Sequence, residues 1–417
     1  MPPAEPPVPP GAGTLLIYAP VPLFRGPDDA LMIEAQAGAG LRLWAAQFAR
    51  LIVMMPLEHG PVPAGWVPLT DLGALLGRIE VAPLPQAYRP DRFLRALPGV
   101  RRSIRELIGR ADYLSFAIGG LFGDWGAVAC REARRMGRPY AVWTDRVESA
   151  VIRQAAGTPG PWRPRLRARL THRPMAWLER AVIRPAALGL FHGRETFEAY
   201  ARYCREPAMV HDIHVAREDH ITVAALAAKR AGVGEGPLRI CYAGRAEAMK
   251  GALDWVEVLE RLAEAGVDFT AEWLGDGGEL PAMRRRLAGA GLTGRVSLPG
   301  FVDDRPRVLA VMRDAHVFLF CHKTPESPRC LIEALISGCP IVGYSGAFAR
   351  DLIAAHGGGR LVAREDLAAL AAAVEGLARD RAALGELIGR AARDGAPFED
   401  RAVFEHRGAL IRAHLGR

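Results

Sequence analysis

The sequence predicts an α/β protein with two Rossmann-like domains that face a central cleft. At 417 residues the chain is too long for one ordinary hydrophobic core. Short apolar runs alternate with segments of helical periodicity, and this pattern restarts after a Gly-rich stretch near residue 234. Apolar strands that alternate with helices are typical of a parallel sheet covered on both faces. We therefore expect ligands at the carboxyl ends of the strands.

The first domain is expected over 13–215, after a Pro-rich tail over 1–12 that we expect to be disordered. Each strand of this domain is predicted from a short apolar run that ends at Pro, Gly or a polar residue. The predicted strands are 14–20, 49–56, 112–120, 139–145 and 186–193.

A linker over 216–236 is expected to lead into a second domain over 237–396. Its strand and helix pattern is clearer than that of the first domain. The predicted strands are 238–244, 269–275, 295–300, 316–321 and 340–344. A final helix within 397–417 is expected to pack back onto the first domain.

The composition indicates a globular cytoplasmic protein, with 50% hydrophobic and 24% charged residues. No uninterrupted apolar run reaches the roughly 18 residues that a transmembrane helix needs. The N-terminus lacks the basic and apolar regions of a signal peptide. The spacing of the six cysteines fits neither a disulfide framework nor a zinc site, so we expect reduced cysteines.

The positive charge is concentrated between Val151 and Arg184, where eight arginines accompany one acid, Glu179. Such a stretch is typical of a surface that faces anionic lipid or an acidic ligand, or of a solvated Arg-rich helix. No basic motif interleaved with aromatic residues supports nucleic-acid binding. Because leucines and Trp177 accompany the arginines, we expect a peripheral association with the cytoplasmic membrane face. Pro164 and Pro174 are expected to break this stretch into shorter helices.

Two cations follow the first strand of the second domain. Arg245 comes directly after Gly244, and Lys250 lies where the next helix begins. The chain has only three lysines. An ammonium group suits a phosphate oxygen, and a guanidinium group binds phosphate through two donors. The alternative is two solvated charges at a helix start.

The stretch "HKTPESPRCLIEALISGCPIVGY" places Glu326 and Glu333 around a predicted helix start. Ser327 is expected as the N-cap and Pro328 as the first helical residue. The helix N-terminus near Arg329 and Cys330 is then a candidate anion site. The two glutamates suit sugar or ribose hydroxyls at its rim; the alternative is an exposed helix residue and a loop charge.

The turn "WLGDGGEL" permits a ligand to approach the backbone closely at Gly277. It is not a dinucleotide fingerprint, because the G-x-G-x-x-G pattern is absent there. A plain tight turn is the alternative reading of this segment.

Taken together, these motifs resemble the retaining nucleotide-sugar glycosyltransferases of family 4, which have the GT-B fold. The resemblance covers about residues 237–395 well and the first half in outline. It implies that Gly244-Arg245 and Lys250-Gly251 hold the donor diphosphate, that Glu326 and Glu333 contact the donor sugar and the ribose, and that Phe301 and Val302 contact the base. The helix start at Arg329 and Cys330 would stabilise charge on the leaving diphosphate.

Three features depart from the family pattern. Six residues, not seven, separate Glu326 from Glu333, so Glu326 is assigned by assuming a one-residue deletion. The family's first Gly-rich loop is missing, and Asp145 stands on the acceptor side where the family often has His.

The resemblance implies sugar transfer with retention from a nucleoside-diphosphate sugar, with neither a metal nor another cofactor. The acceptor is unidentified; the arginine stretch favours a lipid-linked polysaccharide or glycolipid precursor at an anionic membrane surface. A nucleotide-sugar epimerase and a catalytically silent nucleotide-sugar binding protein are the alternatives.

Overall fold

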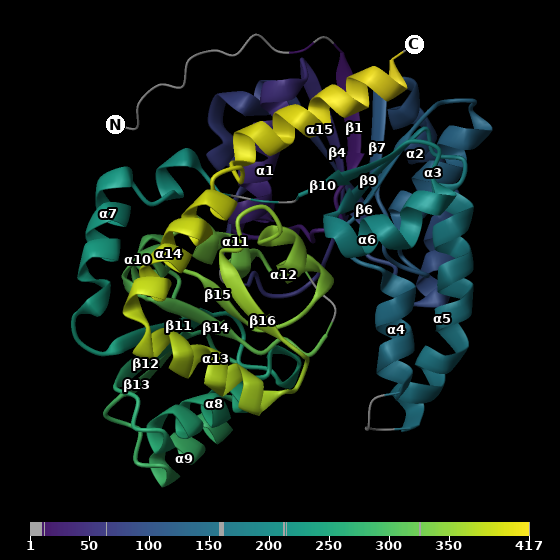
Figure 1. Ribbon diagram of the computed structural model, residues 1–417. Helices are drawn as coiled ribbons and strands as arrows, with labels where there is room; N and C mark the ends of the chain where they lie inside the picture. Colours follow the sequence, from purple (N-terminus) through teal and green to yellow (C-terminus); the bar gives the residue numbers. More distant parts are fainter. Residues whose placement is uncertain are drawn as a thin grey trace. The chain divides into compact units, whose positions relative to one another are not determined.

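The computed structural model describes residues 11, 13–63, 65–157, 162–211, 213, 215–324 and 327–416. The chain divides into two compact units (Figure 1). Unit 1 comprises 1–214 together with 400–417, and unit 2 comprises 215–399. The predicted N-terminal tail lies outside the described residues except for Gly11.

Unit 1 is built on a parallel sheet of seven strands, in the order β10-β9-β8-β7-β1-β4-β6. The strands are β1 (Thr14–Tyr18), β4 (Arg50–Leu57), β6 (Ile79–Pro85), β7 (Tyr113–Ala117), β8 (Ala141–Thr144), β9 (Leu188–His192) and β10 (Pro207–Val210). A small antiparallel sheet joins β2 (Phe24–Arg25), β3 (Leu31–Glu34) and β5 (Trp66–Pro68). Sequence patterning did not predict β6, β10 or the small sheet.

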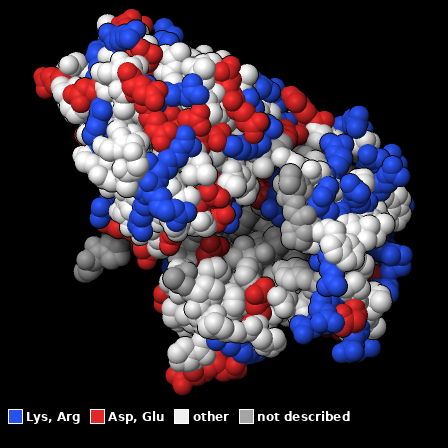
Figure 2. All heavy atoms as spheres, turned by 90° about the horizontal axis from the view of Figure 1, so that it is seen from below, with Lys and Arg blue, Asp and Glu red and all other residues white. Residues whose placement is uncertain are grey.

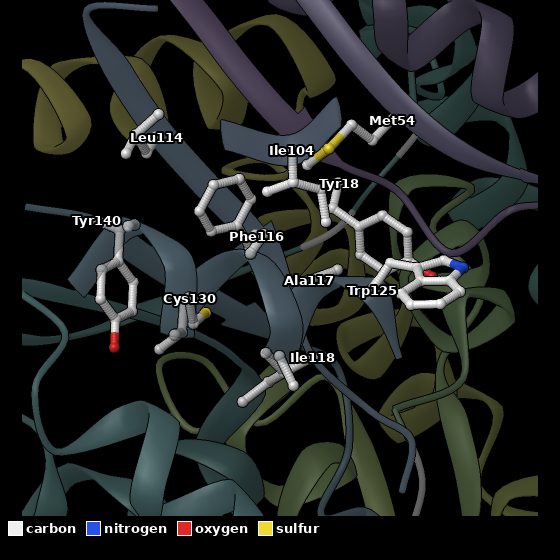
Figure 3. Close-up of a cluster of buried hydrophobic side chains, with 14 of the residues drawn as sticks. Tyr18, Met54, Ile104, Leu114, Phe116, Ala117, Ile118, Trp125, Cys130 and Tyr140 are labelled. Atoms are coloured by element: carbon white, nitrogen blue, oxygen red, sulfur yellow. The ribbon is translucent and has the colours of Figure 1, made fainter. Parts of the chain in front are cut away.

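Two hydrophobic clusters cover the faces of the large sheet. Successive side chains of a strand point to opposite faces, so Leu15 and Ile17 join one cluster while Leu16 and Tyr18 join the other. The cluster of Leu16 and Tyr18 also contains the buried Trp125, which lies beside Tyr18 (Figure 3). The helices of unit 1 are α1 (Ala35–Gln47), α2 (Pro90–Gly109), α3 (Trp125–Arg135), α4 (Glu148–Gly157), α5 (Trp162–Ile183), α6 (Gly193–Tyr200) and α15 (Asp400–Leu415).

The C-terminal helix α15 belongs to unit 1, far from the rest of that unit in sequence. Phe404 packs edge-on against Trp44 of α1, with ring centroids 5.0 Å apart. Arg412 donates a hydrogen bond of 3.0 Å to the carbonyl oxygen of Gln47. These contacts hold the last helix against α1.

Unit 2 has a parallel sheet of six strands, in the order β13-β12-β11-β14-β15-β16. Its strands are β11 (Leu238–Ala243), β12 (Phe269–Leu274), β13 (Val296–Gly300), β14 (Val317–Phe320), β15 (Ile341–Tyr344) and β16 (Gly359–Val362). Its helices are α7 (Val223–Ala231), α8 (Ala252–Glu264), α9 (Leu280–Gly289), α10 (Arg305–Asp314), α11 (Arg329–Ile336), α12 (Ala347–Leu352), α13 (Leu367–Arg379) and α14 (Arg381–Gly395).

The structure differs from the sequence expectations at three places. The segment 216–236, expected as a linker, lies in unit 2 and contains α7, whose N-terminus is capped by the Thr222 hydroxyl. The α11 N-cap is Pro328, and Ser327 lies one residue before it. The arginine-rich stretch forms one helix of 22 residues, α5, with Pro174 inside it. Pro164 is tolerated because it lies in the first turn, where a backbone N–H has no helical partner.

All six cysteines are free thiols. Among the helices of the described residues, none combines the length and apolarity that crossing a membrane requires.

Candidate functional site

The carboxyl ends of three neighbouring strands in unit 2 are joined by backbone hydrogen bonds. The amide of Gly244 donates to the Leu274 carbonyl at 2.9 Å, and the amide of Gly275 donates to the Gly300 carbonyl at 2.8 Å. Phe301 follows directly and is 68% exposed, while Val302 is half-buried. The loops that follow β11, β12 and β13 thus form one continuous edge, with an exposed aromatic ring at its end.

Gly277 lies where the loop after β12 crosses the loop after β11. The amide of Ala246 donates to the Asp276 carbonyl, and the amide of Glu279 donates to the Ala246 carbonyl, both at 2.9 Å. A Cβ atom on Gly277 would lie 2.5 Å from the Ala246 carbonyl oxygen, and its φ of 157° is one that side chains rarely adopt. Any larger residue would push apart the two loops. Arg245 lies in the first of these loops, with an exposed side chain.

Gly251 brings the start of α8 against the end of β14. Its φ is 68°, and a Cβ atom there would lie 2.1 Å from the Cys321 carbonyl oxygen. The amide of Lys323 also donates to the Met249 carbonyl at 2.9 Å. Lys250, between these contacts, is therefore held beside the loop that begins at His322.

His322 is a buried neutral base next to Lys250. Its Nε2 atom and the Tyr242 hydroxyl share a hydrogen bond of 2.8 Å, and the side chain is 7% exposed. Burial holds the pKa of His322 well below its usual range, and the charge of Lys250 adds to this effect. The imidazole therefore adds no positive charge to this edge at neutral pH.

The second lysine of this region has a structural partner. Lys323 Nζ lies 2.7 Å from Asp254 Oδ1, and the Tyr344 hydroxyl donates to Asp254 Oδ2 at 2.7 Å. Asp254 is on α8, so the ion pair joins that helix to the end of β14 and to β15. Lys323 is accordingly committed to this network.

Glu333 lies on the second turn of α11 and pairs with an arginine from α10. Arg305 Nη1 donates to Glu333 Oε1 at 2.5 Å, and Arg305 Nη2 donates to Asp219 Oδ2 at 3.0 Å. The Glu333 carboxylate raises the pKa of Arg305 against the opposing effect of burial. Arg305 occupies one acceptor position of the carboxylate, which has about four. Glu333 can thus keep this ion pair and still accept hydrogen bonds from hydroxyl groups.

The N-terminus of α11 begins with Arg329 and Cys330. Glu326 lies outside the described residues, so its predicted position is not part of the structure. Within the part of the chain that is described, no three His, Cys, Asp or Glu side chains gather as a metal site would require.

Asp145, the predicted acceptor-side residue, lies in unit 1 directly after β8 and is exposed. It is close to Glu148 at the start of α4. Burial raises the pKa of Glu148, and the negative charge of Asp145 contributes in the same direction.

The structure thus brings Gly244 and Arg245 to the loop of Gly277 and holds Lys250 beside His322. Sequence reasoning did not single out His322, Tyr242 or Arg305. One signal was available for His322, because it is the second residue after a strand. Arg305 carried a weaker signal as the first residue of a helix that follows the predicted base-contacting segment.

Residues 237–380 match the family model described as Glycosyl transferases group 1. The chain is 32% identical over 192 residues to 2-deoxystreptamine glucosyltransferase of Streptomyces kanamyceticus. That alignment covers 45% of this chain and 48% of the relative, so the chain matches about half the length of this curated relative.

Solved structures resemble the whole chain. Anabaena HepE, crystallised in complex with UDP, has a TM-score of 0.64 at 15% identity, with 96% of this chain and 99% of that chain covered. WaaG, a glycosyltransferase involved in lipopolysaccharide biosynthesis, has a TM-score of 0.62 at 14% identity, with 95% and 99% covered. The chain therefore has the fold of the GT-B glycosyltransferases, and residues 237–380, which lie within unit 2, are similar to the glycosyltransferases of group 1.

Proposed function

We propose that this protein transfers a sugar from a nucleoside-diphosphate sugar to an acceptor, with retention of configuration and without a metal ion. The observation that carries the proposal is the strand edge of unit 2, where Gly244, Arg245 and Lys250 lie inside the segment that matches glycosyltransferases. HepE was crystallised with UDP and with UDP-glucose, which supports this class of donor.

The donor diphosphate would bind where the loops after β11 and β12 cross. Arg245 and Lys250 supply cations, and the first backbone N–H groups of α11, near Arg329 and Cys330, supply hydrogen-bond donors and a partial positive charge. Negative charge grows on the diphosphate as the glycosidic bond lengthens, and prearranged donors stabilise that charge. This arrangement would perform the task that a divalent cation performs in metal-dependent transferases.

His322 strengthens the argument for Lys250 as a phosphate ligand. A protonated imidazole at this position would repel the lysine, whereas burial keeps it neutral and hydrogen-bonded to Tyr242. Lys323, whose charge is committed to Asp254, is not assigned a role in the clamp.

Glu333 would accept hydrogen bonds from the ribose, with Arg305 fixing the orientation of its carboxylate. Glu326 would contact the donor sugar. Phe301 and Val302, at the end of β13, would contact the base. Retention would follow from attack on the same face from which the diphosphate departs, with the diphosphate helping to deprotonate the acceptor.

We further propose a lipid-linked acceptor, a precursor of a glycolipid or polysaccharide, and a peripheral position on the cytoplasmic membrane face. Support comes from one side of α5, here called the outer face: Trp162, Leu166, Leu170, Arg173 and Trp177. Trp162, Leu170 and Trp177 are 67%, 66% and 70% exposed, so these apolar side chains do not pack on unit 1. Exposed apolar groups among arginines are the composition of a helix that lies on anionic lipid.

The test is incubation with a panel of nucleoside-diphosphate sugars, with and without EDTA, followed by product analysis. We expect one donor to be bound and slowly hydrolysed, and its sugar to be transferred when a suitable acceptor is added. EDTA should leave the rate unchanged. Inversion of the free donor sugar would identify an epimerase, and tight donor binding without hydrolysis or transfer would identify a silent binding protein. Loss in EDTA that magnesium or manganese restores would contradict the metal-free mechanism.

A further inference from the structure

Unit 1 contains a cavity of about 860 Å³ at the carboxyl ends of its strands. Three segments line it: 88–90 at the start of α2, 120–122 after β7, and the α4–α5 hairpin. In sheets of this type, ligands bind at the carboxyl ends of the strands. The cavity therefore lies where a ligand of unit 1 is expected.

Part of the cavity wall is apolar and firmly held. Leu121, Phe122 and Ile152 line it. The ring of Phe122 packs edge-on against Phe93, which stacks at 5.0 Å on the buried Trp125. This wall offers apolar surface to a ligand in a preformed shape.

The loop behind this wall is fixed by a buried carboxylate. Asp124 accepts hydrogen bonds from the amides of Gly119 at 3.1 Å, Gly120 at 3.3 Å and Ala127 at 3.1 Å. Its side chain caps α3 and also holds the turn that enters the cavity wall. The cavity is thus present without any ligand-induced ordering of this loop.

The charged groups that line the cavity are three arginines and one glutamate. Arg89 pairs with Asp91 at 3.0 Å, and Glu148 accepts a hydrogen bond from Arg146 at 2.6 Å. Arg163 and Arg167 differ from these groups: across the described residues, neither guanidinium has a carboxylate within ion-pair distance. The contact of Arg163 is with an aromatic ring, because its Cζ atom lies 5.5 Å from the ring centroid of Trp162. They lie one helical turn apart on α5, on the same side of the helix.

We propose that this cavity binds the sugar acceptor and that the acceptor is a phosphorylated amphiphile: its phosphate pairs with Arg163 and Arg167, and its apolar part lies against Leu121, Phe122 and Ile152. The inference rests on the proposed function. Guanidinium groups bind phosphate through paired donors, and they would repel an amine-bearing acceptor. The chemistry thus differs from that of the 2-deoxystreptamine that appears in the name of the Streptomyces kanamyceticus relative.

The cavity side of α5 lies next to its outer face and is made of different residues. At 100° per residue, Arg163, Arg167 and Thr171 occupy one sector of the helix surface, and Leu166, Leu170 and Arg173 occupy the sector next to it, with Arg163 nearest to the boundary. The arginines of the two sides can therefore be changed separately. This separation gives the experiment a control with the same loss of charge on the same helix.

The test is calorimetric titration of the full chain with geranyl phosphate, a soluble isoprenoid phosphate, and with geraniol and inorganic phosphate alone. We expect geranyl phosphate to bind, and each part alone to bind much more weakly. In the Arg163→Gln/Arg167→Gln variant its affinity should fall about ten- to hundredfold, as expected when charge-assisted hydrogen bonds are lost. The control variant Arg169→Gln/Arg173→Gln should bind as the wild type does.

Equal losses in the two variants would overturn the inference, because the effect would then be one of overall charge. Equal affinities for geranyl phosphate and geraniol would also overturn it, because the phosphate would play no part. The donor panel separates this inference from the proposed function. Failure to bind geranyl phosphate with intact donor hydrolysis would reject the inference alone, whereas binding without any donor recognition would reject the glycosyltransferase proposal.

Discussion

The two units build the loop after a central strand in opposite ways. In unit 2, the loop after β11 is held by backbone groups of its neighbour, and Gly277 allows the two loops to cross. In unit 1, the loop after β7 is held by a buried side chain, Asp124, which accepts three amide hydrogen bonds. A loop held by backbone contacts needs glycine at fixed positions, and these glycines can be read in a sequence. A loop held by one carboxylate leaves a much weaker pattern.

The two units also differ in how their cationic side chains are paired with carboxylates. Beside the strand edge of unit 2, Lys323 and Arg305 pair with carboxylates, and Arg245 and Lys250 are the cations that the proposal assigns to the diphosphate. Helix α5 of unit 1, by contrast, is rich in arginine and carries a single acid, Glu179, whose carboxylate accepts hydrogen bonds from the amide and hydroxyl of Ser149. In the proposed function, unit 2 binds the diphosphate, which all nucleoside-diphosphate sugars share. The positive charge of α5 in unit 1 would instead match one particular anionic acceptor.

The largest expected effect concerns the cations of unit 2. Replacing Arg245 or Lys250 with Ala should lower donor turnover by roughly two to three powers of ten, the usual loss when stabilisation of transition-state charge is removed. Arg285→Ala, an exposed arginine on α9, is the matched control and should leave turnover unchanged. Steady-state donor hydrolysis measures all three variants. Wild-type rates in both the Arg245 and Lys250 variants would remove the clamp from the mechanism.

The sequence predicted more of the strand edge of unit 2 than of any other part of the candidate site. Gly244, Arg245 and Lys250 could be placed because strands of a parallel sheet end at a shared edge, which needs only the order of strands and loops. The bond between Tyr242 and His322 could not be predicted, because 80 residues separate the partners and their meeting depends on β11 pairing with β14.

In unit 1, contacts between segments that are far apart in the sequence were even harder to predict. The cavity combines segments from β6 to α5 whose proximity follows from the strand order of the sheet. The expectation that Pro164 and Pro174 break the arginine-rich stretch into shorter helices was wrong. Pro174 lies inside α5, and the helix continues despite the loss of one backbone hydrogen bond there. The linker expectation placed α7 outside unit 2, because a short Ala-rich helix next to glycines resembles a connecting segment.

The second effect concerns the buried carboxylate of unit 1. Burial raises the pKa of Asp124 to about 6, even though three amides donate to it. The folded state then holds this proton more tightly than the unfolded state, whose pKa is about 3.8. The contribution of Asp124 to the free energy of unfolding should therefore fall as pH rises from about 4 to 6, by up to about 3 kcal/mol.

Denaturant titrations of the wild type and Asp124→Asn at several pH values measure this contribution. The difference between the two proteins in unfolding free energy should change between pH 4 and 6 and stay constant above pH 7. Other titrating groups are common to both proteins and cancel. Parallel pH profiles would show that the carboxyl titrates at its ordinary pKa.

The third effect separates the two acids of unit 2. Glu333→Gln should weaken donor binding about tenfold with a much smaller change in kcat, because ribose contacts are equal in the ground and transition states. Glu326→Gln should lower kcat more than donor affinity, because its contact with the donor sugar is expected to strengthen as the glycosidic bond lengthens in the transition state. Separate measurement of kcat and donor Kd distinguishes these outcomes. A silent Glu326→Gln variant would mean that another residue contacts the sugar.

The smallest expected effect concerns the outer face of α5, because lipid contact at an interface recovers only part of the free energy of burying an apolar side chain. Arginine side chains gather around the α4–α5 hairpin, on the right of Figure 2. Each basic residue near an anionic surface contributes on the order of 1 kcal/mol, and salt screens this attraction. The wild type should therefore sediment with anionic vesicles at low salt, and less at high salt or with neutral vesicles.

Leu170→Ser/Trp177→Ser should weaken this vesicle binding roughly three- to tenfold, while donor hydrolysis stays at the wild-type rate. Val223→Ser is the matched control, because Val223 is 87% exposed on α7 of unit 2 and should not affect sedimentation. If the wild type fails to bind anionic vesicles at low salt, the membrane proposal is wrong, and the cavity of unit 1 would take its acceptor from solution. If the Leu170→Ser/Trp177→Ser and Val223→Ser variants lose vesicle binding equally, the outer face of α5 is not the membrane-binding surface. The two units would then not differ in their affinity for lipid.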